Sequence, residues 1–391
     1  MKSFPETEPA PPSSAFELTS DMRFPELDGV RGVAITMVVL WHYVGVTLPP
    51  SGIEQHRDAW VPTFKQSLII FRSGVDLFFV LSGFLIGGIL IDKRQSNNYY
   101  KTFYLRRICR IFPVYYLLIS LFALAKAFDM QGELFSGPIP VLAYVGFTQN
   151  YFMSIFGTYG AAWLSATWSL AIEEQFYVFF PLIVRCSRQA LPWILAGGVI
   201  CAPLLRIWSY FHFGGDDFPA YTWLPCRLDA LCWGGLLSYA LRTRRGCDWV
   251  DRHLRSLRWG LGCLAGGAVA LDLAIARNIG FHMSIWGHTL LGALYVLALL
   301  LIILNAGSPR TRWLRSQPLI WLGQISYGVY LLHGIVVIIV FKAAERNRVL
   351  DSWYNGLLLV IALLVTLGTG AASYYWLERP FLRLGHRATY T

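Results

Sequence analysis

The stretch that decides the fold is LDGVRGVAITMVVLWHYVG, residues 27–45. It is almost entirely apolar, and its length is close to the roughly 20 residues that a helix needs to cross the hydrocarbon core of a membrane. Past the Asp28 at its edge, two basic side chains interrupt it, Arg31 near its beginning and His42 deep inside. Such groups are costly in lipid, so each is a candidate functional residue. The stretch therefore predicts a membrane-spanning helix that carries part of a site.

The rest of the chain has the same character. Of its 391 residues, 55% are hydrophobic and 14% are charged, whereas about 25% of the residues of soluble domains are charged. An apolar stretch at 140–152 is too short to cross, and we expect an interfacial or re-entrant segment there. Longer apolar runs recur and predict an all-α, polytopic transmembrane helix bundle of about ten spans, at 30–47, 69–91, 105–126, 166–184, 190–210, 227–241, 259–276, 283–304, 318–341 and 355–377.

The positive charges indicate the orientation of the bundle. When ten spans alternate, most of the 33 Lys and Arg residues fall on the side of the N-terminus, as the positive-inside rule requires if both termini are cytoplasmic. Topology thus explains the net charge of +10 without a nucleic-acid partner. We predict a multi-pass protein of the cell inner membrane, with a disordered cytoplasmic tail at 1–26, a transmembrane domain at 27–381 and a short cytoplasmic tail at 382–391.

Cysteines and repeats point to no other class of protein. The seven cysteines include no C-x-x-C pair, so we expect neither a disulfide framework nor a bound metal. No internal repeat or matched pair of broken helices is evident, which disfavours a secondary transporter without excluding it.

Arg31 and His42 are expected to share one face of the first span. Eleven steps of about 100° come to roughly 20° past three full turns, with a rise of about 16 Å. Arg31 then lies near the cytoplasmic surface and His42 past the middle of the membrane, and Asp28 can pair with Arg31 one turn away. Taken alone, Arg31 also fits a snorkelling interface residue, and His42 a hydrogen-bonded structural residue.

The second and third spans carry further charges. Arg72 and Asp76 are four residues apart and can pair on one helix face, either as a structural pair or as part of a site. Arg106, Arg107 and Arg110 cluster within about one turn at the cytoplasmic surface. This cluster fits a topology determinant, and it equally fits a phosphate site, because guanidinium groups bind phosphates through two hydrogen bonds.

The fourth span begins with two adjacent carboxylates, Glu173 and Glu174. They project about 100° apart, so only one can face a given site. Either can orient an imidazole such as His42, as carboxylates commonly do in catalysis. The aromatic and acidic segment 211–225 is a candidate wall of a binding site, although Trp and Tyr are expected at a membrane interface in any case. Lesser candidates, each explained at least as well by structure alone, are Arg206, Arg227 with Asp229, and His333.

Six motifs, in this order, resemble those of the acyltransferase 3 family of integral membrane acyltransferases. The resemblance runs from about Leu27 to Phe381 and is specific because all six motifs fall on one ten-span profile. The motifs are LDGVRGVAI with LWHY, GVDLFFVLSGFLI, YLRRICRIFPVYY, WSLAIEEQFY, ISYGVYLLH and YYWLERPF.

The resemblance implies an activity and roles for residues. Members of the family move an acyl group, commonly acetyl from acetyl-CoA, to a hydroxyl of a carbohydrate or another secondary product. Arg31 and His42 match the family's functional Arg-x10-His pair. Its Arg-x-x-Arg element is matched by Arg107 and Arg110, and its paired glutamates by Glu173 and Glu174. Some members carry a periplasmic esterase-like domain, and we expect this chain to be the stand-alone form.

The implied reaction assigns His42 as general base, since imidazole titrates near neutral pH. The phosphates of the acyl-CoA donor are expected on the arginine cluster, with the pantetheine arm reaching inward to His42. An acyl-His42 intermediate is an open variant. The acceptor also stays open between an O-antigen or exopolysaccharide sugar, a lipid-linked oligosaccharide and a small glycosylated product such as a macrolide. A non-enzymatic acyl relay, a transporter and a homo-oligomer are not excluded.

Overall fold

A computed structural model describes residues 18–19, 22, 24–48, 64–65, 67–274 and 279–391. Within these ranges the chain is helical and contains no strand, so the predicted all-α class is confirmed. Most of the predicted N-terminal tail at 1–26 lies outside the described residues; helix α1 already begins at Pro25.

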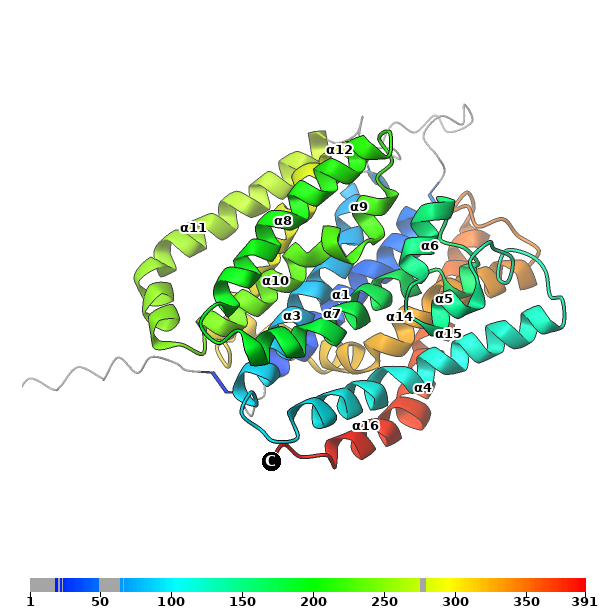
Figure 1. Ribbon diagram of the computed structural model, residues 1–391. Helices are drawn as coiled ribbons and strands as arrows, with labels where there is room; N and C mark the ends of the chain where they lie inside the picture. The colour runs from blue at the N-terminus through cyan, green and yellow to red at the C-terminus, as the bar shows by residue number, and fades with distance from the viewer. Residues whose placement is uncertain (1–17, 20–21, 23, 49–63, 66, 275–278) are drawn as a thin grey trace, which may run out of the picture.

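Each of the ten predicted spans coincides with a helix (Figure 1). Seven of the helices are long and apolar enough to cross a membrane. The other three are α7, which carries two glutamates, α10, which has only 17 residues, and α11, which begins with a run of arginines. The structure therefore supports a polytopic helical bundle, and the count of ten spans stays a prediction. The ten helices are α1 (Pro25–Leu40), α3 (Gly74–Asp92), α4 (Tyr99–Ala127), α7 (Thr167–Cys186), α8 (Leu191–His212), α10 (Leu224–Ala240), α11 (Arg244–Ala274), α13 (His288–Leu304), α14 (Gln317–Ala343) and α15 (Trp353–Ala372).

Shorter helices extend or connect these ten. The predicted interfacial segment 140–152 forms α5 (Val141–Val145) and the first half of α6 (Gln149–Phe156), both too short to span. The others are η1 (Trp41–Gly45), η2 (Ile69–Ser73), η3 (Ala162–Leu164), α9 (Phe218–Thr222), α12 (Ile279–His282), η5 (Met283–Gly287), η6 (Pro309–Arg315), η7 (Ser373–Glu378) and α16 (Arg379–His386).

Glycines set the closest helix contacts in the bundle. A Cβ atom added at Gly83 of α3 would lie 2.0 Å from the carbonyl oxygen of Leu231 on α10. One added at Gly32 of α1 would lie 2.2 Å from the carbonyl oxygen of Leu319 on α14. Any side chain at these positions would force the backbones apart, which is why small residues are typical of such membrane-helix contacts.

The close approach of α10 to α3 overturns one predicted ion pair. Asp76 does not pair with Arg72; it binds Arg227 of α10 at 2.7 Å and His288 of α13 at 3.2 Å. Arg206 of α8 binds Asp229 at 2.8 Å, and all four side chains of these two arginine–aspartate pairs are buried. Helical spacing predicts only which side chains can pair within one helix, whereas the partner of Asp76 lies on a neighbouring helix.

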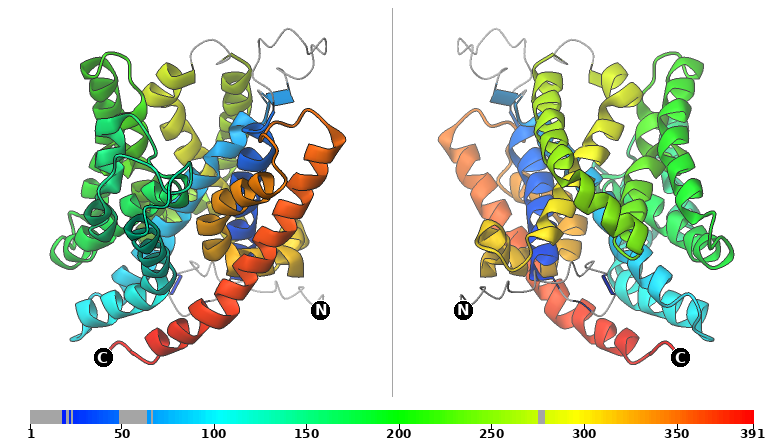
Figure 2. Two further views of the ribbon diagram at one scale, coloured as in Figure 1. Left: turned by 90° about the vertical axis from the view of Figure 1, so that its right-hand side faces the viewer. Right: turned by 90° about the vertical axis from the view of Figure 1, so that its left-hand side faces the viewer.

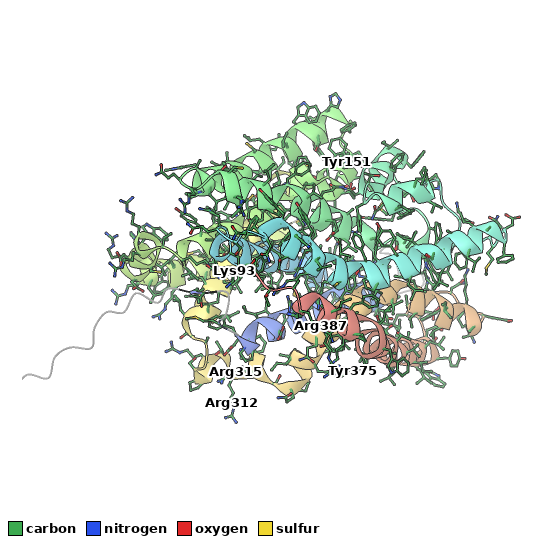
Figure 3. All side chains as sticks on the ribbon, turned by 60° about the horizontal axis from the view of Figure 1, so that its bottom comes forward. Lys93, Tyr151, Arg312, Arg315, Tyr375 and Arg387 are labelled. Atoms are coloured by element: carbon green, nitrogen blue, oxygen red, sulfur yellow. The ribbon has the colours of Figure 1, made fainter. Side chains whose placement is uncertain are left out.

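The C-terminus lies at one end of the bundle (Figures 1 and 2). Lys93, Arg312, Arg315 and Arg387 lie there, although they come from three separate segments (Figure 3). The predicted C-terminal tail at 382–391 continues α16 and then packs on the start of α4, where the Asn97 amide donates to the Thr391 carbonyl at 2.6 Å. This clustering supports the predicted cytoplasmic side, which remains a prediction.

Candidate active site

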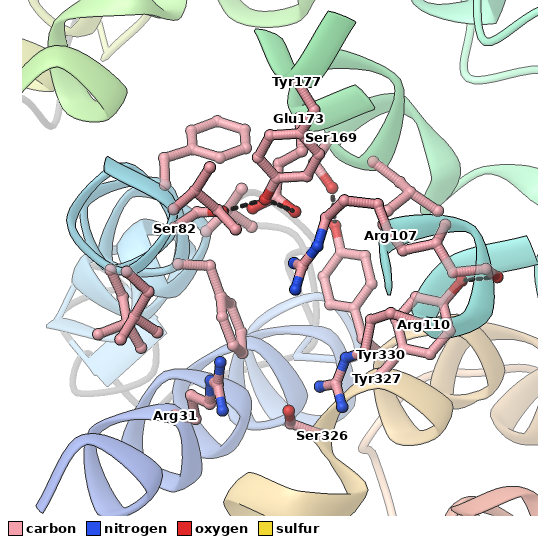
Figure 4. A pocket seen from close by; sticks show the side chains of 18 residues that line it. Arg31, Ser82, Arg107, Arg110, Ser169, Glu173, Tyr177, Ser326, Tyr327 and Tyr330 are labelled. Atoms are coloured by element: carbon pink, nitrogen blue, oxygen red, sulfur yellow. Dashed lines mark hydrogen bonds between the residues drawn. The ribbon is translucent and has the colours of Figure 1, made fainter. Parts of the chain in front are cut away.

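Three arginines converge on a pocket at the N-terminal end of α1, here called the arginine pocket. Arg31 comes from α1, and Arg107 and Arg110 come from α4 (Figure 4). The pocket has a volume of about 130 Å³, and Glu173 is the carboxylate among its lining residues. Three cations facing one carboxylate favour an anionic ligand.

The partners of these side chains leave much of the positive charge available. Arg31 donates to Asp28 at 3.0 Å, as predicted. Among the described residues neither Arg107 nor Arg110 forms an ion pair; Arg107 instead lies 6.0 Å from the ring centre of Tyr177. Tyr177 donates to Glu173 at 3.4 Å and accepts from Ser82, so the glutamate is held by hydroxyl groups on the pocket wall.

Arg106 does not join the pocket. Its Nε and Nη2 atoms donate to the carbonyl oxygen of Ala388 at 3.0 and 2.8 Å, and its guanidinium lies over the ring of Tyr390. Arg107 and Arg110 are three residues apart on α4 and therefore share a face, while Arg106 projects toward the C-terminal segment. The structure thus separates the predicted cluster into two pocket residues and one residue that anchors the chain end.

A second and larger space, here called the histidine cavity, lies at the other end of α1. It has a volume of about 590 Å³ and is lined by His42, Arg72 and His333 together with the aromatic rings of Trp168 and Tyr221. This volume lies within the range of about 300–1,000 Å³ that is usual for ligand sites. His42 and Arg72 are thereby brought into one site, although Arg72 and Asp76 are not paired.

The backbone orients the His42 ring. His42 lies in the π-helical turn η1, and its Nδ1 atom is 2.8 Å from the carbonyl oxygen of Val38. Because a carbonyl only accepts hydrogen bonds, Nδ1 carries the proton, and Nε2 of the neutral ring is left with a lone pair. Nε2 has no hydrogen-bond partner among the described residues, so it is available to accept a proton from a ligand in the cavity.

The predicted contact between His42 and a glutamate is wrong for the described structure. Glu173 lines the arginine pocket and does not line the histidine cavity. Glu174 lines neither; its Oε1 atom is buried and lacks a hydrogen-bond partner among the described residues. The neighbour of His42 is His333, whose ring centre lies 4.7 Å away and whose Nδ1 is 2.6 Å from the carbonyl oxygen of Tyr330.

Tyr330 lies on the walls of both spaces. Tyr330 and Val75 are the two residues that line both the arginine pocket and the histidine cavity. The Tyr330 hydroxyl is 2.5 Å from the Ser169 hydroxyl on α7, which holds the ring across the gap between α14 and α7. In place of the predicted single channel from Arg31 to His42, the structure has two spaces whose walls share Tyr330 and Val75.

Sequence reasoning missed Tyr330 and Ser169. A signal for Tyr330 was present, because Tyr330 precedes His333 by three residues in ISYGVYLLH and so shares its helix face. The sequence carries no comparable signal for Ser169, because serines are common in membrane helices. Among the described residues no group of three or more His, Cys, Asp or Glu side chains lies close enough together to hold a metal ion.

The fold is a helical bundle with several helices apolar and long enough to span a membrane, and it holds an arginine-lined pocket and a histidine-lined cavity whose walls share Tyr330 and Val75. The family model of the acyltransferase 3 family, which is described as an acyltransferase domain, matches residues 24–375 of this chain. The chain belongs to this family.

Curated relatives agree on the kind of protein. The chain is 27% identical over 384 residues to "Putative peptidoglycan O-acetyltransferase YrhL" of Bacillus subtilis, covering 93% of this chain and 56% of the relative. It is 25% identical over 396 residues to "Putative O-acetyltransferase SACOL0978" of Staphylococcus aureus, covering 96% and 60%. It is 26% identical over 374 residues to "Peptidoglycan O-acetyltransferase OatA" of Listeria monocytogenes, covering 92% and 56%.

The aligned region covers only part of each relative. The chain spans a little over half of the length of each of them. No solved structure matches the chain.

Proposed function

We propose that the protein is a membrane-embedded O-acyltransferase that moves an acyl group, acetyl from acetyl-CoA, to a hydroxyl of a carbohydrate acceptor. The observation that carries the proposal is the meeting of the arginine pocket and the histidine cavity at Tyr330. Such an arrangement suits a reaction whose donor is anionic at one end and whose acceptor is held beside a base. The family and the O-acetyltransferase names of the relatives support it.

The donor would enter from the arginine pocket. Arg31, Arg107 and Arg110 present guanidinium groups that bind phosphates through paired hydrogen bonds. The volume of about 130 Å³ is below the usual size of a complete ligand site. We therefore assign the pocket to the phosphates and the start of the slender pantetheine arm, with the adenine ring outside it at the cytoplasmic surface. The arm would pass Tyr330 to bring its thioester beside His42.

The acceptor would occupy the histidine cavity. Its aromatic lining includes Trp168 and Tyr221, whose ring centres are 4.5 Å apart, and Tyr159. Aromatic faces suit the apolar faces of sugar rings, and Tyr221 comes from the segment 211–225 that the sequence marks as a possible acceptor wall. The names of the relatives favour a cell-envelope glycan as acceptor.

His42 would then act as general base. Its Nε2 lone pair removes the proton of the acceptor hydroxyl as the hydroxyl oxygen attacks the thioester carbonyl carbon. A tetrahedral intermediate forms, and its collapse breaks the carbon–sulfur bond and releases coenzyme A as the thiolate, which regains the proton from His42. In the variant route, Nε2 attacks the thioester first and passes the acyl group on. Both routes require the same lone pair.

The test is transfer by the purified protein. Labelled acetyl-CoA is incubated with the protein in lipid nanodiscs and with a panel of acceptors, namely peptidoglycan fragments, O-antigen, exopolysaccharide and a glycosylated macrolide. We expect acetylated saccharide by mass spectrometry, with stoichiometric release of coenzyme A. Uptake of a solute into vesicles without consumption of acetyl-CoA would identify a transporter instead. Transfer only when a second protein is added would identify an acyl relay.

A further inference from the structure

Arg72 is a cation in the histidine cavity that the proposed chemistry has not yet used. It lies in η2, directly before α3. Its guanidinium lies 5.6 Å from the ring centre of Trp41, the residue next to His42, and 5.4 Å from the ring centre of Tyr221. Two aromatic faces therefore hold the guanidinium in place beside the proposed base.

No carboxylate of the described residues compensates this charge by an ion pair. Asp76, one turn further on, is bound to Arg227 and His288. Glu133, which also lines the cavity, is paired with Arg348. Asp217 acts on Arg72 only at longer range. Keeping an unpaired cation within a membrane protein is costly, and such residues mark functional sites.

The reaction creates one negative charge that needs a partner in this place. When the acceptor oxygen attacks, the carbonyl π electrons move to the carbonyl oxygen, which becomes an oxyanion. Fixed donors aimed at such an oxygen supply a large part of the catalysis of acyl transfer, because they need no reorganisation during the reaction. A guanidinium held by Trp41 and Tyr221 meets this requirement, and the same Trp41 adjoins His42 in the chain.

We infer that Arg72 is a further catalytic residue, which donates N–H hydrogen bonds to the oxyanion of the tetrahedral intermediate. The carbon–oxygen bond to the acceptor forms as His42 takes the hydroxyl proton, and the oxyanion is held by Arg72. Collapse of the intermediate restores the carbonyl and expels the thiolate, which takes up that proton. Arg72 remains protonated throughout. This inference rests on the proposed acyl transfer.

The geometry favours the oxyanion over a carboxylate group of the acceptor as the partner of Arg72. The rings of Trp41 and Tyr221 flank the guanidinium, so its position is set before any acceptor binds. Arg72 is also close enough to His42 for its charge to act on that ring, which places the guanidinium near the base beside which the oxyanion would form.

The experiment separates kcat from KM. Arg72→Gln and Arg72→Lys are assayed in nanodiscs, with Arg346→Gln as the matched control, because Arg346 stacks on Tyr354 and lines neither space. We expect Arg72→Gln to lower kcat about 10²- to 10³-fold, with the KM values for acetyl-CoA and acceptor within about two-fold of the wild type. Arg72→Lys keeps the charge and should recover part of kcat, whereas the control should match the wild type.

Other results overturn the inference. A raised KM for the acceptor at unchanged kcat would make Arg72 an acceptor-binding residue. Unchanged kinetics in both variants would remove it from the reaction. If Arg72→Gln does not fold, as judged by its elution profile and thermal unfolding, the test rests on Arg72→Lys. A wild-type kcat in Arg72→Lys together with a raised KM for the acceptor would still contradict the inference. Absence of acyl transfer by the wild type would instead refute the proposed function, and this inference with it.

Discussion

The separation of three neighbouring arginines gives the sharpest test of the donor site. Arg106, Arg107 and Arg110 lie on the same helix and within about one turn, yet only Arg107 and Arg110 line the arginine pocket. Replacing each by Gln removes the same charge from nearly the same place in the sequence. A general effect of charge near the membrane would make the three variants alike, whereas a defined phosphate site would not.

The size of the effect follows from the contacts. A hydrogen bond to a charged group contributes about 1.5–3 kcal/mol, and each 1.4 kcal/mol is a factor of about ten in affinity. Loss of one arginine–phosphate contact should therefore raise the KM for acetyl-CoA about 10- to 150-fold in Arg107→Gln and in Arg110→Gln. Arg106→Gln should leave this KM within about two-fold, because its guanidinium is engaged by Ala388 and Tyr390.

The assay measures initial rates of coenzyme A release against acetyl-CoA concentration at saturating acceptor. Acetyl-dephospho-CoA, which lacks the 3′-phosphate, serves as a second donor: the arginine that binds this phosphate should lose much less with the shortened donor than with the complete one. Equal KM values in all three variants would refute the assignment of the pocket. So would a larger effect in Arg106→Gln than in Arg107→Gln.

Three further predictions concern the base, the ring between the two spaces and the helix contact. His42→Gln should lower kcat about 10²- to 10⁴-fold with normal thermal unfolding, and near-normal turnover would exclude His42 as the base. Tyr330→Ala removes a side chain that lines both spaces and should open one to the other, so coenzyme A release without acceptor should rise as water reaches the thioester; an unchanged rate of hydrolysis would contradict a dividing role of the ring. Gly83→Ala must part α3 from α10, and such overpacking should cost about 1–3 kcal/mol; an unfolding temperature equal to that of the wild type would speak against this close contact.

Apolar runs predicted the fold well because a spanning helix must satisfy its backbone hydrogen bonds within its own segment. Local spacing predicted the pair of Arg31 with Asp28, because both side chains lie on one helix and one turn apart. Segment length predicted that 140–152 is separate from the long helices. Hydropathy says little about which helices are neighbours. The partner of Asp76 lies 151 residues away on α10, and a four-residue spacing favoured Arg72 instead.

The same limit applies to the candidate site. The sequence brought Arg31, Arg107 and Arg110 to one end of the bundle, and the structure places all three in one pocket. The sequence showed that Arg106 belongs to the arginine cluster of the third span, but it could not show that its side chain turns to the C-terminal segment. That contact depends on where Ala388 lies in the folded protein. Nor could the sequence show that Glu173 faces the arginines and leaves the orientation of His42 to the Val38 carbonyl.

The ring of Tyr330 also bears on the electrical insulation of the membrane. An open path lined by arginines and imidazoles would conduct anions and protons, and each charge that crosses a potential of 100 mV dissipates about 2.3 kcal/mol. The Tyr330 hydroxyl is bound to Ser169, which fixes this ring on the wall that the arginine pocket and the histidine cavity share. If the Tyr330 ring moves aside only when the pantetheine arm of the donor takes its place, the donor fills the opening between the two spaces and keeps it closed to water and ions. If the donor and the acceptor reach the protein from opposite sides of the membrane, as the proposed function implies, acyl groups could then be transferred without a leak.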